Sequence, residues 1–139
     1  MAKLGKSSEE RLNTCHPDLQ KVFRRVVEKY DLTITCGTRG EAEQNEAFRT
    51  GKSKVQFPKS KHNLTPSLAV DAVPYPIDWN DRSRFYHFAG YVLGIAEGMG
   101  IKLRWGGDWD GDFDLKDQKF FDLPHFELVA EGAKHADSE

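Results

Sequence analysis

Apolar side chains recur along the chain at two different intervals, and these intervals separate expected helices from expected strands. Over residues 17–30 they recur at helical spacing, which predicts an amphipathic helix. The same spacing follows Asn80 and Asp81, either of which can cap a helix that ends at Gly100. Residues 41–51 are rich in helix-forming side chains and close on a glycine, so they predict a shorter helix.

Four short segments have the alternating or β-branched pattern of strands, and they lie at residues 32–36, 67–73, 101–105 and 125–129. Residues 51–67 carry prolines, lysines and serines and predict a loop. Ser7 and Glu10 have the spacing of a capping box, which predicts a further helix near the N-terminus. Helices and short strands are mixed without a dividing linker. We therefore expect one α+β domain over residues 1–139, with a frayed tail over 130–139.

Composition and charge exclude several classes of protein. The chain is 38% hydrophobic and 30% charged, which is too apolar for a disordered protein and too polar for a membrane-embedded one. Its 20 basic and 22 acidic residues give a net charge of −2, so nothing favours a nucleic-acid partner. Cys15 and Cys36 are too few for a disulfide framework and are expected to be small buried residues.

The N-terminal segment lacks the apolar core of a signal peptide, and no apolar run approaches the roughly 20 residues that span a bilayer. We therefore expect a protein that is made in the cytoplasm without stable membrane association. Any target outside the cell would be reached only after release.

Asp71 interrupts the apolar run LAVDAV, and a carboxylate buried there without a partner would cost several kcal/mol. It must therefore lie at a surface, be paired, or bind a positive group. His62 precedes it, and His125 opens the last expected strand. Two histidines and one carboxylate are the ligand set of a catalytic zinc site. A histidine is more often a surface or core residue, so the spacing alone leaves both interpretations open.

A second acid, Asp122, lies three residues before His125, with Pro124 between them. We expect a restrained turn that points both side chains at one centre. A carboxylate that is not itself a ligand can take the proton of the attacking water and pass it to the leaving amine.

Two segments of the chain, SKHNLTPSLAVDAVPYP and DLPHFEL, together resemble the M15 zinc peptidases. That group comprises D-alanyl-D-alanine carboxypeptidases and dipeptidases and the L-alanyl-D-glutamate endopeptidases of bacteriophage lysis. The family pattern of Ser-x-His, Ala-x-Asp and an acid shortly before a histidine is matched at residues 60–62, 69–71 and 122–125. The resemblance continues through TRGEAEQNEAF and GIKLRWGGDW and covers most of residues 16–129.

The resemblance implies roles for individual residues. The zinc ligands would be His62, Asp71 and His125. Asp122 would be the general base, and Arg39 would stabilise the developing oxyanion. Ser60 and Gln44 match positions that contact substrate. The implied fold is the small one shared with the hedgehog signalling domain, an antiparallel sheet flanked by helices. The gap between His62 and Asp71 is longer than the commonest family spacing, which implies a longer turn.

The expected function is a zinc-dependent peptidase that cuts the peptide stem of peptidoglycan at the L-alanyl-D-glutamate bond. The form PSLAVD, the short chain and the missing signal peptide favour a phage endolysin that acts on the cell wall after release. We also expect the protein to be a monomer. One alternative is a D-alanyl-D-alanine carboxypeptidase or dipeptidase. Another is a non-catalytic zinc-containing module that binds cell wall or a protein partner. Asp122 argues against that module, because a structural zinc site usually closes with a fourth protein ligand.

An acidic loop follows the third expected strand, with carboxylates at 108, 110, 112 and 114. Alternate carboxylates suit calcium, but the glycine at 111 and Lys119 do not match an EF-hand register. A calcium loop and a solvated loop that rims the active site both stay open, with Asp108 at the substrate. Trp105 is followed by two glycines and is expected to form the cleft wall, although an ordinary core position is the alternative.

Overall fold

The computed structural model describes residues 3–114 and 121–129. Within them four α-helices, one 3-10 turn and four strands follow one another along the chain: α1 (Lys6–Leu12), α2 (Pro17–Val27), β1 (Leu32–Cys36), α3 (Glu41–Arg49), η1 (Lys61–Asn63), β2 (Ala69–Pro74), α4 (Arg82–Gly98), β3 (Leu103–Gly106) and β4 (Asp122–Leu128). The expected α+β class is confirmed. The predicted tail over 130–139 lies outside the described residues.

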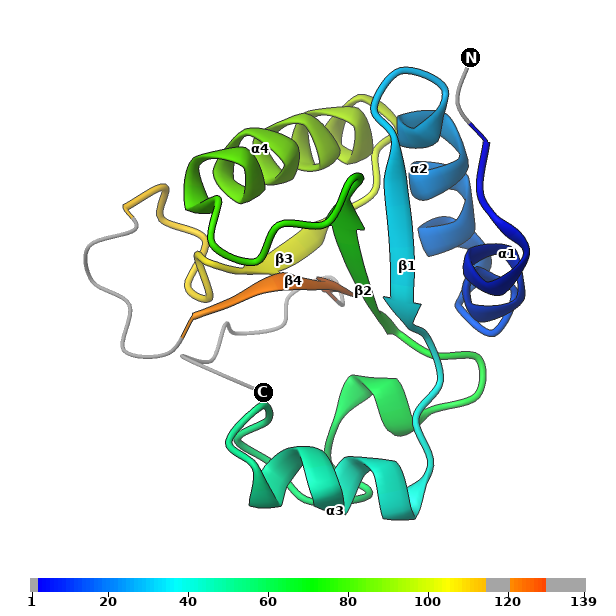
Figure 1. The fold of residues 1–139 in the computed structure, drawn as a ribbon, viewed down its shortest axis with the longest axis vertical. Helices are drawn as coiled ribbons and strands as arrows, with labels where there is room; N and C mark the ends of the chain where they lie inside the picture. The colour runs from blue at the N-terminus through cyan, green and yellow to red at the C-terminus, as the bar shows by residue number, and fades with distance from the viewer. Residues whose placement is uncertain (1–2, 115–120, 130–139) are drawn as a thin grey trace.

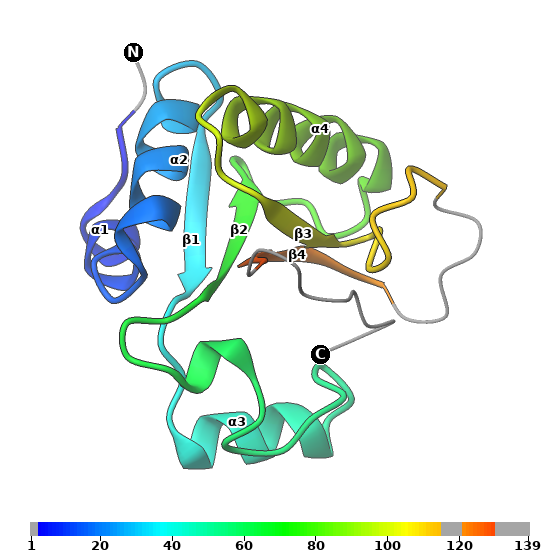
Figure 2. The same ribbon diagram turned by 180° about the vertical axis from the view of Figure 1, so that it is seen from behind.

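The strands form one antiparallel sheet in the order β1-β2-β4-β3. Helices α2 and α4 lie together against one face of this sheet, whereas α3 lies apart, beyond the end of β1 (Figure 1). The view from behind shows the same separation, with η1 between α3 and the strands (Figure 2). The sheet therefore has a face covered by helices and a second face turned toward the α3 side.

Strand alternation decides which residues enter the core. Val70 pairs with Phe126 across β2 and β4, and both are fully buried among the helices. Phe126 meets the rings of Phe23 from α2 and Phe88 from α4 edge to face. Asp71, the neighbour of Val70, must then project from the opposite face of the sheet.

Helix ends follow local capping chemistry. Asp81 caps α4 by accepting a hydrogen bond from the backbone N–H of Arg84, and Gly100 beyond its end has φ +74°. The capping box expected at Ser7 is wrong, because α1 begins at Lys6 after Gly5 without a side-chain cap. Helix α2 ends at Val27, earlier than its apolar periodicity predicted.

Strand β4 begins at Asp122, so the turn expected before His125 is instead extended strand. Its register against β3 shifts between Trp105 and Gly106, which pair with Phe126 and Asp122. Pro124 lies within this irregularity, where its missing N–H breaks no regular ladder. Among the described residues, no helix is both long and apolar enough to cross a bilayer.

Candidate metal centre and substrate cleft

Three side chains from distant parts of the chain converge on the uncovered face of the sheet. His62 Nε2 lies 3.2 Å from Asp71 Oδ1 and 3.3 Å from His125 Nδ1, and the remaining pair, His125 Nδ1 and Asp71 Oδ1, is 3.3 Å apart. Zinc bonds of about 2.0–2.1 Å place tetrahedral ligand atoms about 3.3 Å apart. The three atoms therefore form a triangle of the size that a tetrahedral zinc ion requires. We call it the ligand triangle.

The sheet and a capped turn bring these residues together. Asp71 and His125 are direct partners in the register of β2 and β4, so both side chains stand on one face. His62 comes from η1, whose N-cap Ser60 accepts a hydrogen bond from the backbone N–H of His62 at 3.1 Å. The Asn63 side chain accepts in return from the Ser60 backbone N–H at 3.0 Å. Ser60 is buried and shapes the turn that carries His62.

Each histidine has a hydrogen-bond acceptor at the nitrogen that points away from the ligand triangle. His62 Nδ1 lies 2.7 Å from the carbonyl oxygen of Gly37, and His125 Nε2 lies 2.7 Å from Glu127 Oε1. Carbonyl and carboxylate oxygens only accept, so these nitrogens carry the protons. The opposite nitrogens are therefore turned toward the triangle, as metal ligation requires.

The electrostatics of the ligand triangle favour a bound positive charge. Burial lowers the pKa of His62, but the Asp71 carboxylate outweighs this and raises it to about 10. Burial likewise raises the pKa of Asp71, but the charge of His62, followed by the contact with His125, outweighs it and holds that pKa well below its usual range. Without a metal, the imidazole of His62 is protonated and supplies a positive charge beside Asp71. A divalent ion would replace that proton.

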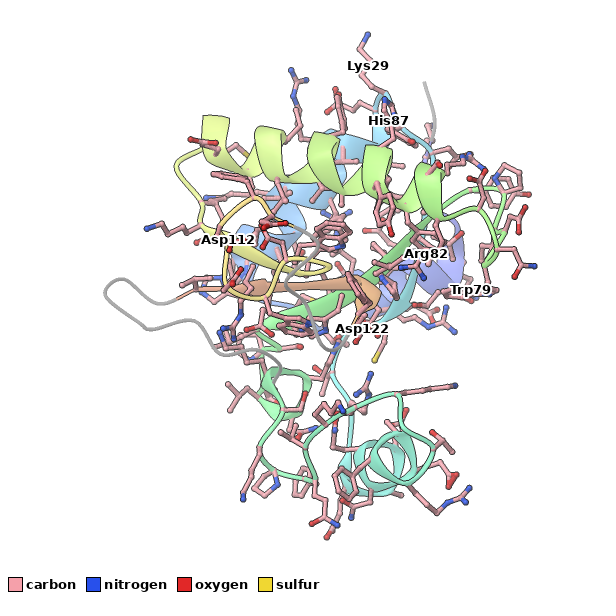
Figure 3. The ribbon with its side chains drawn as sticks, turned by 90° about the vertical axis from the view of Figure 1, so that its left-hand side faces the viewer. Lys29, Trp79, Arg82, His87, Asp112 and Asp122 are labelled. Carbon is pink, nitrogen blue, oxygen red and sulfur yellow. The ribbon has the colours of Figure 1, made fainter. Side chains whose placement is uncertain are left out.

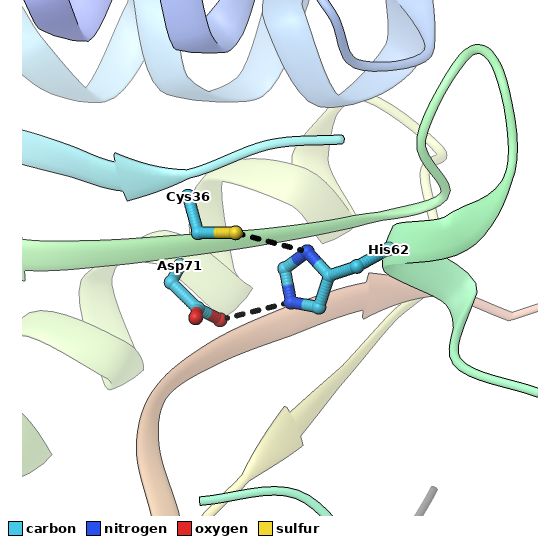
Figure 4. A group of neighbouring side chains, drawn as sticks. All are labelled: Cys36, His62 and Asp71. Atoms are coloured by element: carbon cyan, nitrogen blue, oxygen red, sulfur yellow. Dashed lines mark hydrogen bonds and ion pairs between the residues drawn. The ribbon is translucent and has the colours of Figure 1, made fainter. Parts of the chain in front are cut away.

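Cys36 lies beside the ligand triangle and was expected to be buried. Its thiol is 3.8 Å from His62 Nδ1, on the side of the ring opposite the contact with Asp71 (Figure 4). It is partly exposed and lines the cleft. Cys15, in contrast, is buried as expected, and burial raises its pKa to about 12, which makes its thiol unreactive.

Asp122 stands next to the ligand triangle without completing it. Its Oδ2 is 4.0 Å from His125 Nδ1, and its side chain is partly exposed. Figure 3 shows Asp122 on the side of the sheet turned away from α4. A carboxylate in this place would lie close to a metal-bound water, as a proton carrier must. With Asp71 and His125 it is also near enough to share a metal ion, since their ligand atoms lie within 4.8 Å of one another.

Arg39 and Gln44 form a connected pair behind the cleft. Arg39 Nη2 is 3.4 Å from Asp71 Oδ2, and Nη1 donates to Gln44 Oε1 at 2.9 Å. Gln44 is fully buried and donates to Ser53 Oγ and the Val55 carbonyl. The structure thus places Arg39 at the cleft and Gln44 behind it, as a support for the guanidinium.

Trp105 and Asp108 do not lie among the residues that line the cleft. Trp105 is 5% exposed, belongs to the core, and meets the ring of Tyr86 from α4. Its indole N–H donates to the carbonyl of Leu123. Asp108 is buried in the acidic loop, and its Oδ2 accepts a hydrogen bond from the backbone N–H of Phe113.

A cleft of about 950 Å³ opens beside Asp71 and Asp122. Its two walls differ in chemistry. Helix α3 and the turn after it supply polar and charged side chains, namely Glu43, Glu46, Thr50 and Lys52. The opposite side supplies aromatic rings, namely Trp79, Phe85 and Phe121. Such a cleft suits a peptide that carries both charged and apolar groups.

Sequence reasoning missed a buried network behind His125, which comprises Glu127, Arg104, Lys61 and Trp109. Glu127 carried the same signal that singled out Asp71, a carboxylate inside an apolar strand pattern. The other members gave no local signal, because they approach Glu127 only through the pairing of strands and turns.

Known proteins resemble this chain in both sequence and structure. The sequence profile of the phage L-alanyl-D-glutamate peptidase family matches residues 1–129. The chain is 38% identical over 135 residues to the L-alanyl-D-glutamate peptidase of Escherichia phage T5. The aligned region covers 91% of this chain and 98% of that protein. The crystal structure of the Serratia marcescens L-Ala D-Glu endopeptidase ChiX is similar with a TM-score of 0.70 and 30% identity, over 91% of this chain and 90% of that one. This chain therefore belongs to the phage L-alanyl-D-glutamate peptidase family.

Proposed function

We propose that this protein is a zinc-dependent peptidase that cuts the L-alanyl-D-glutamate bond of peptidoglycan stem peptides. The observation that carries the proposal is the ligand triangle with a further acid, Asp122, beside it. Zinc has the bond lengths and the ligand preference that this donor set fits. The choice of the L-alanyl-D-glutamate bond rests on the relatives, which are named as peptidases of that bond.

The residues of the cleft divide the chemistry between them. Bound zinc would polarise the scissile carbonyl and acidify a water molecule. Asp122 takes the proton of the attacking water and returns it to the departing amine. Arg39 holds its positive charge at the cleft, where it stabilises the negative charge that develops on the carbonyl oxygen. Gln44 keeps the guanidinium in place through its hydrogen bond.

Digestion of purified peptidoglycan tests both the class and the bond. Clearing of a peptidoglycan gel without chelator, and none with chelator, supports a metal-dependent enzyme and contradicts a non-catalytic module. Mass spectrometry of the fragments then identifies the bond. New N-terminal D-glutamyl groups support the proposal, whereas released D-alanine would show the carboxypeptidase or dipeptidase alternative.

The biological setting follows from this activity. We propose that the protein acts as a phage endolysin, made in the host cytoplasm and active as a monomer on the cell wall after release. Sedimentation of the purified protein tests the monomer. Lysis of cells only when the membrane is permeabilised tests the need for release.

We also propose that the acidic loop holds a calcium ion. Carboxylate oxygens of Asp108, Asp110 and Asp112 lie within 4.8 Å of one another. Asp108 Oδ1 is buried and finds no hydrogen-bond partner among the described residues. Burial, followed by the neighbouring acids, raises the pKa of Asp108. A bound cation would offset the repulsion between these carboxylates. Lys119 of the expected register lies outside the described residues.

Calorimetry with calcium chloride tests this site in the zinc-loaded protein. We expect saturable binding that Asp108→Asn weakens while zinc content stays unchanged. Absence of heat at millimolar calcium would leave the loop as a solvated acidic turn.

A further inference from the structure

Glu127 is a fully buried carboxylate that has no part in the ligand triangle. It lies on β4 two residues after His125, so both side chains stand on the same face of the sheet. A carboxylate in this position costs several kcal/mol unless partners compensate it. The contacts of Glu127 show how it is compensated and what it does.

The two oxygens of Glu127 have different partners. Oε1 accepts a hydrogen bond from His125 Nε2 at 2.7 Å. Oε2 accepts from Arg104 at 3.1 Å through Nε and 2.5 Å through Nη2, and lies 3.0 Å from Lys61 Nζ. Oε1 thus accepts the hydrogen bond from the imidazole, while Oε2 contacts two cationic side chains.

The partners of Oε2 come from the elements that surround the site. Arg104 is the direct cross-strand partner of Glu127 on β3, and Lys61 precedes the ligand His62 on η1. Lys61 also donates to the carbonyl of Leu128 at 2.6 Å. The carboxylate is therefore held in orientation by a strand on one side and by the ligand-bearing turn on the other.

A second restraint acts on the face of the His125 ring. The ring of Trp109 lies tilted over it, with centroids 5.2 Å apart. The Arg104 guanidinium carbon is 5.6 Å from the centroid of the same indole. Arg104 thus contacts both groups that restrain His125, Glu127 at its edge and Trp109 over its face.

We propose that Glu127 is a positioning residue, which fixes His125 in the tautomer that carries its proton on Nε2 and presents Nδ1 to the metal. The inference rests on the proposed function only in taking His125 as a metal ligand. A carboxylate can only accept at Nε2, so the opposite tautomer would lose a short charge-assisted hydrogen bond. Outer partners of metal-bound histidines typically contribute about 10- to 100-fold in metal affinity. In the equivalent place His62 Nδ1 has uncharged partners, the Gly37 carbonyl at 2.7 Å and the Cys36 thiol at 3.8 Å.

Glu127→Gln tests the proposal with the smallest change in shape. Arg104 and Lys61 donate hydrogen bonds only, so they will hold the amide oxygen of the new side chain. Its NH₂ group must then face His125 Nε2, which drives the ring proton to Nδ1, the atom needed by the metal. We expect ¹⁵N NMR of the neutral imidazoles to show Nε2–H in the metal-free wild type and Nδ1–H in the variant. Chelator competition should show zinc binding weakened about 10- to 100-fold.

Two further variants separate positioning from simple structural support. Glu28→Gln makes the same change at a partly exposed glutamate, the C-cap of α2, which pairs with Arg25, and should alter neither measurement. Lys61→Met removes one cation but leaves Arg104 on Oε2, so the free energy of unfolding should fall while the Nε2–H tautomer remains. A purely structural role for Glu127 predicts that Glu127→Gln also loses stability and keeps both the tautomer and the zinc affinity. That result would overturn the proposal.

The wild-type spectrum keeps the test decisive if Glu127→Gln does not fold. A proton on Nδ1 of His125 in the wild type would refute the inference by itself. Failure of the wild type to bind zinc would instead refute the proposed function, and the tautomer would still report on Glu127.

Discussion

Asp71 and His125 are directly paired across β2 and β4, and their ligand atoms lie 3.3 Å apart. Two of the three proposed ligands are therefore positioned by the register of one antiparallel strand pair. A slip of one residue would turn one of them to the helix-covered face, because side chains alternate along a strand. The same pairing that buries Val70 against Phe126 thus places two of the proposed ligands side by side on the other face of the sheet.

His125→Ala should abolish both zinc binding and peptidase activity, because it removes one corner of the ligand triangle. Metal content after dialysis and a zymogram measure the two losses. His87→Ala is a suitable control, since His87 lies on α4 and hydrogen-bonds to Tyr30 Oη. Figure 3 shows it far from Asp122, at the outer side of the helix layer. Full activity of His125→Ala would contradict the proposed ligand set.

Asp122→Asn should keep zinc and lose turnover. The amide preserves the shape of the side chain but cannot take a proton, and loss of a general base typically costs about 100- to 10,000-fold in rate. The position of Asp122 outside the ligand triangle, 4.0 Å from His125 Nδ1, is the reason zinc should remain. Rates on a defined stem peptide, with metal analysis of the same sample, separate the two effects. Near-wild-type hydrolysis would show that another group carries the proton.

The metal-free protein should lose stability as the pH rises above neutrality. The pKa of His62 is lowered by burial but raised further by Asp71, to about 10 in the folded state, against about 6.5 in an unfolded chain. Its stabilising contribution is therefore complete below pH about 6.5 and is lost as the pH rises toward 10. The folded pKa of Asp71 is depressed, so its contribution is complete above pH about 4 and is lost in acid.

Denaturant unfolding in the presence of chelator, at several pH values between 5 and 9, measures this decline. Asp71→Asn should lose the decline, because the neutral amide no longer holds a proton on His62. Zinc must displace the same proton, so its affinity for the wild type should rise with pH over this range. A decline of equal size in Asp71→Asn would show that another group causes it.

The convergence of the candidate ligands could be predicted from the sequence because the signals that single them out are local. The carboxylate of Asp71 within an apolar strand is a local anomaly, and with the motifs around His62 and His125 it led to the family, which the comparisons confirm. The α+β class was also predictable, since helical and strand periodicities are properties of short segments.

What escaped prediction depends on contacts between distant segments. No pattern near Glu127 in the sequence predicts Arg104 and Lys61 as its partners, because only the folded sheet and η1 bring them together. Trp105 was expected at the cleft, but strand alternation turns it to the helix-covered face. Pro124 suggested a turn, whereas an irregular register lets β4 include it.

Ser60→Ala separates two roles that the sequence and the structure suggest for this residue. The family resemblance implies a substrate contact, but Ser60 is 2% exposed and caps η1 through the backbone N–H of His62. Loss of such a cap costs about 1 kcal/mol. It should also loosen His62, so we expect lower stability and weaker zinc binding, with KM for the zinc-saturated enzyme unchanged. Asn63→Ala removes the reciprocal bond to the Ser60 N–H and should act in the same direction. If KM rises in Ser60→Ala while zinc affinity stays at the wild-type value, the hydroxyl binds substrate and the capping role is secondary.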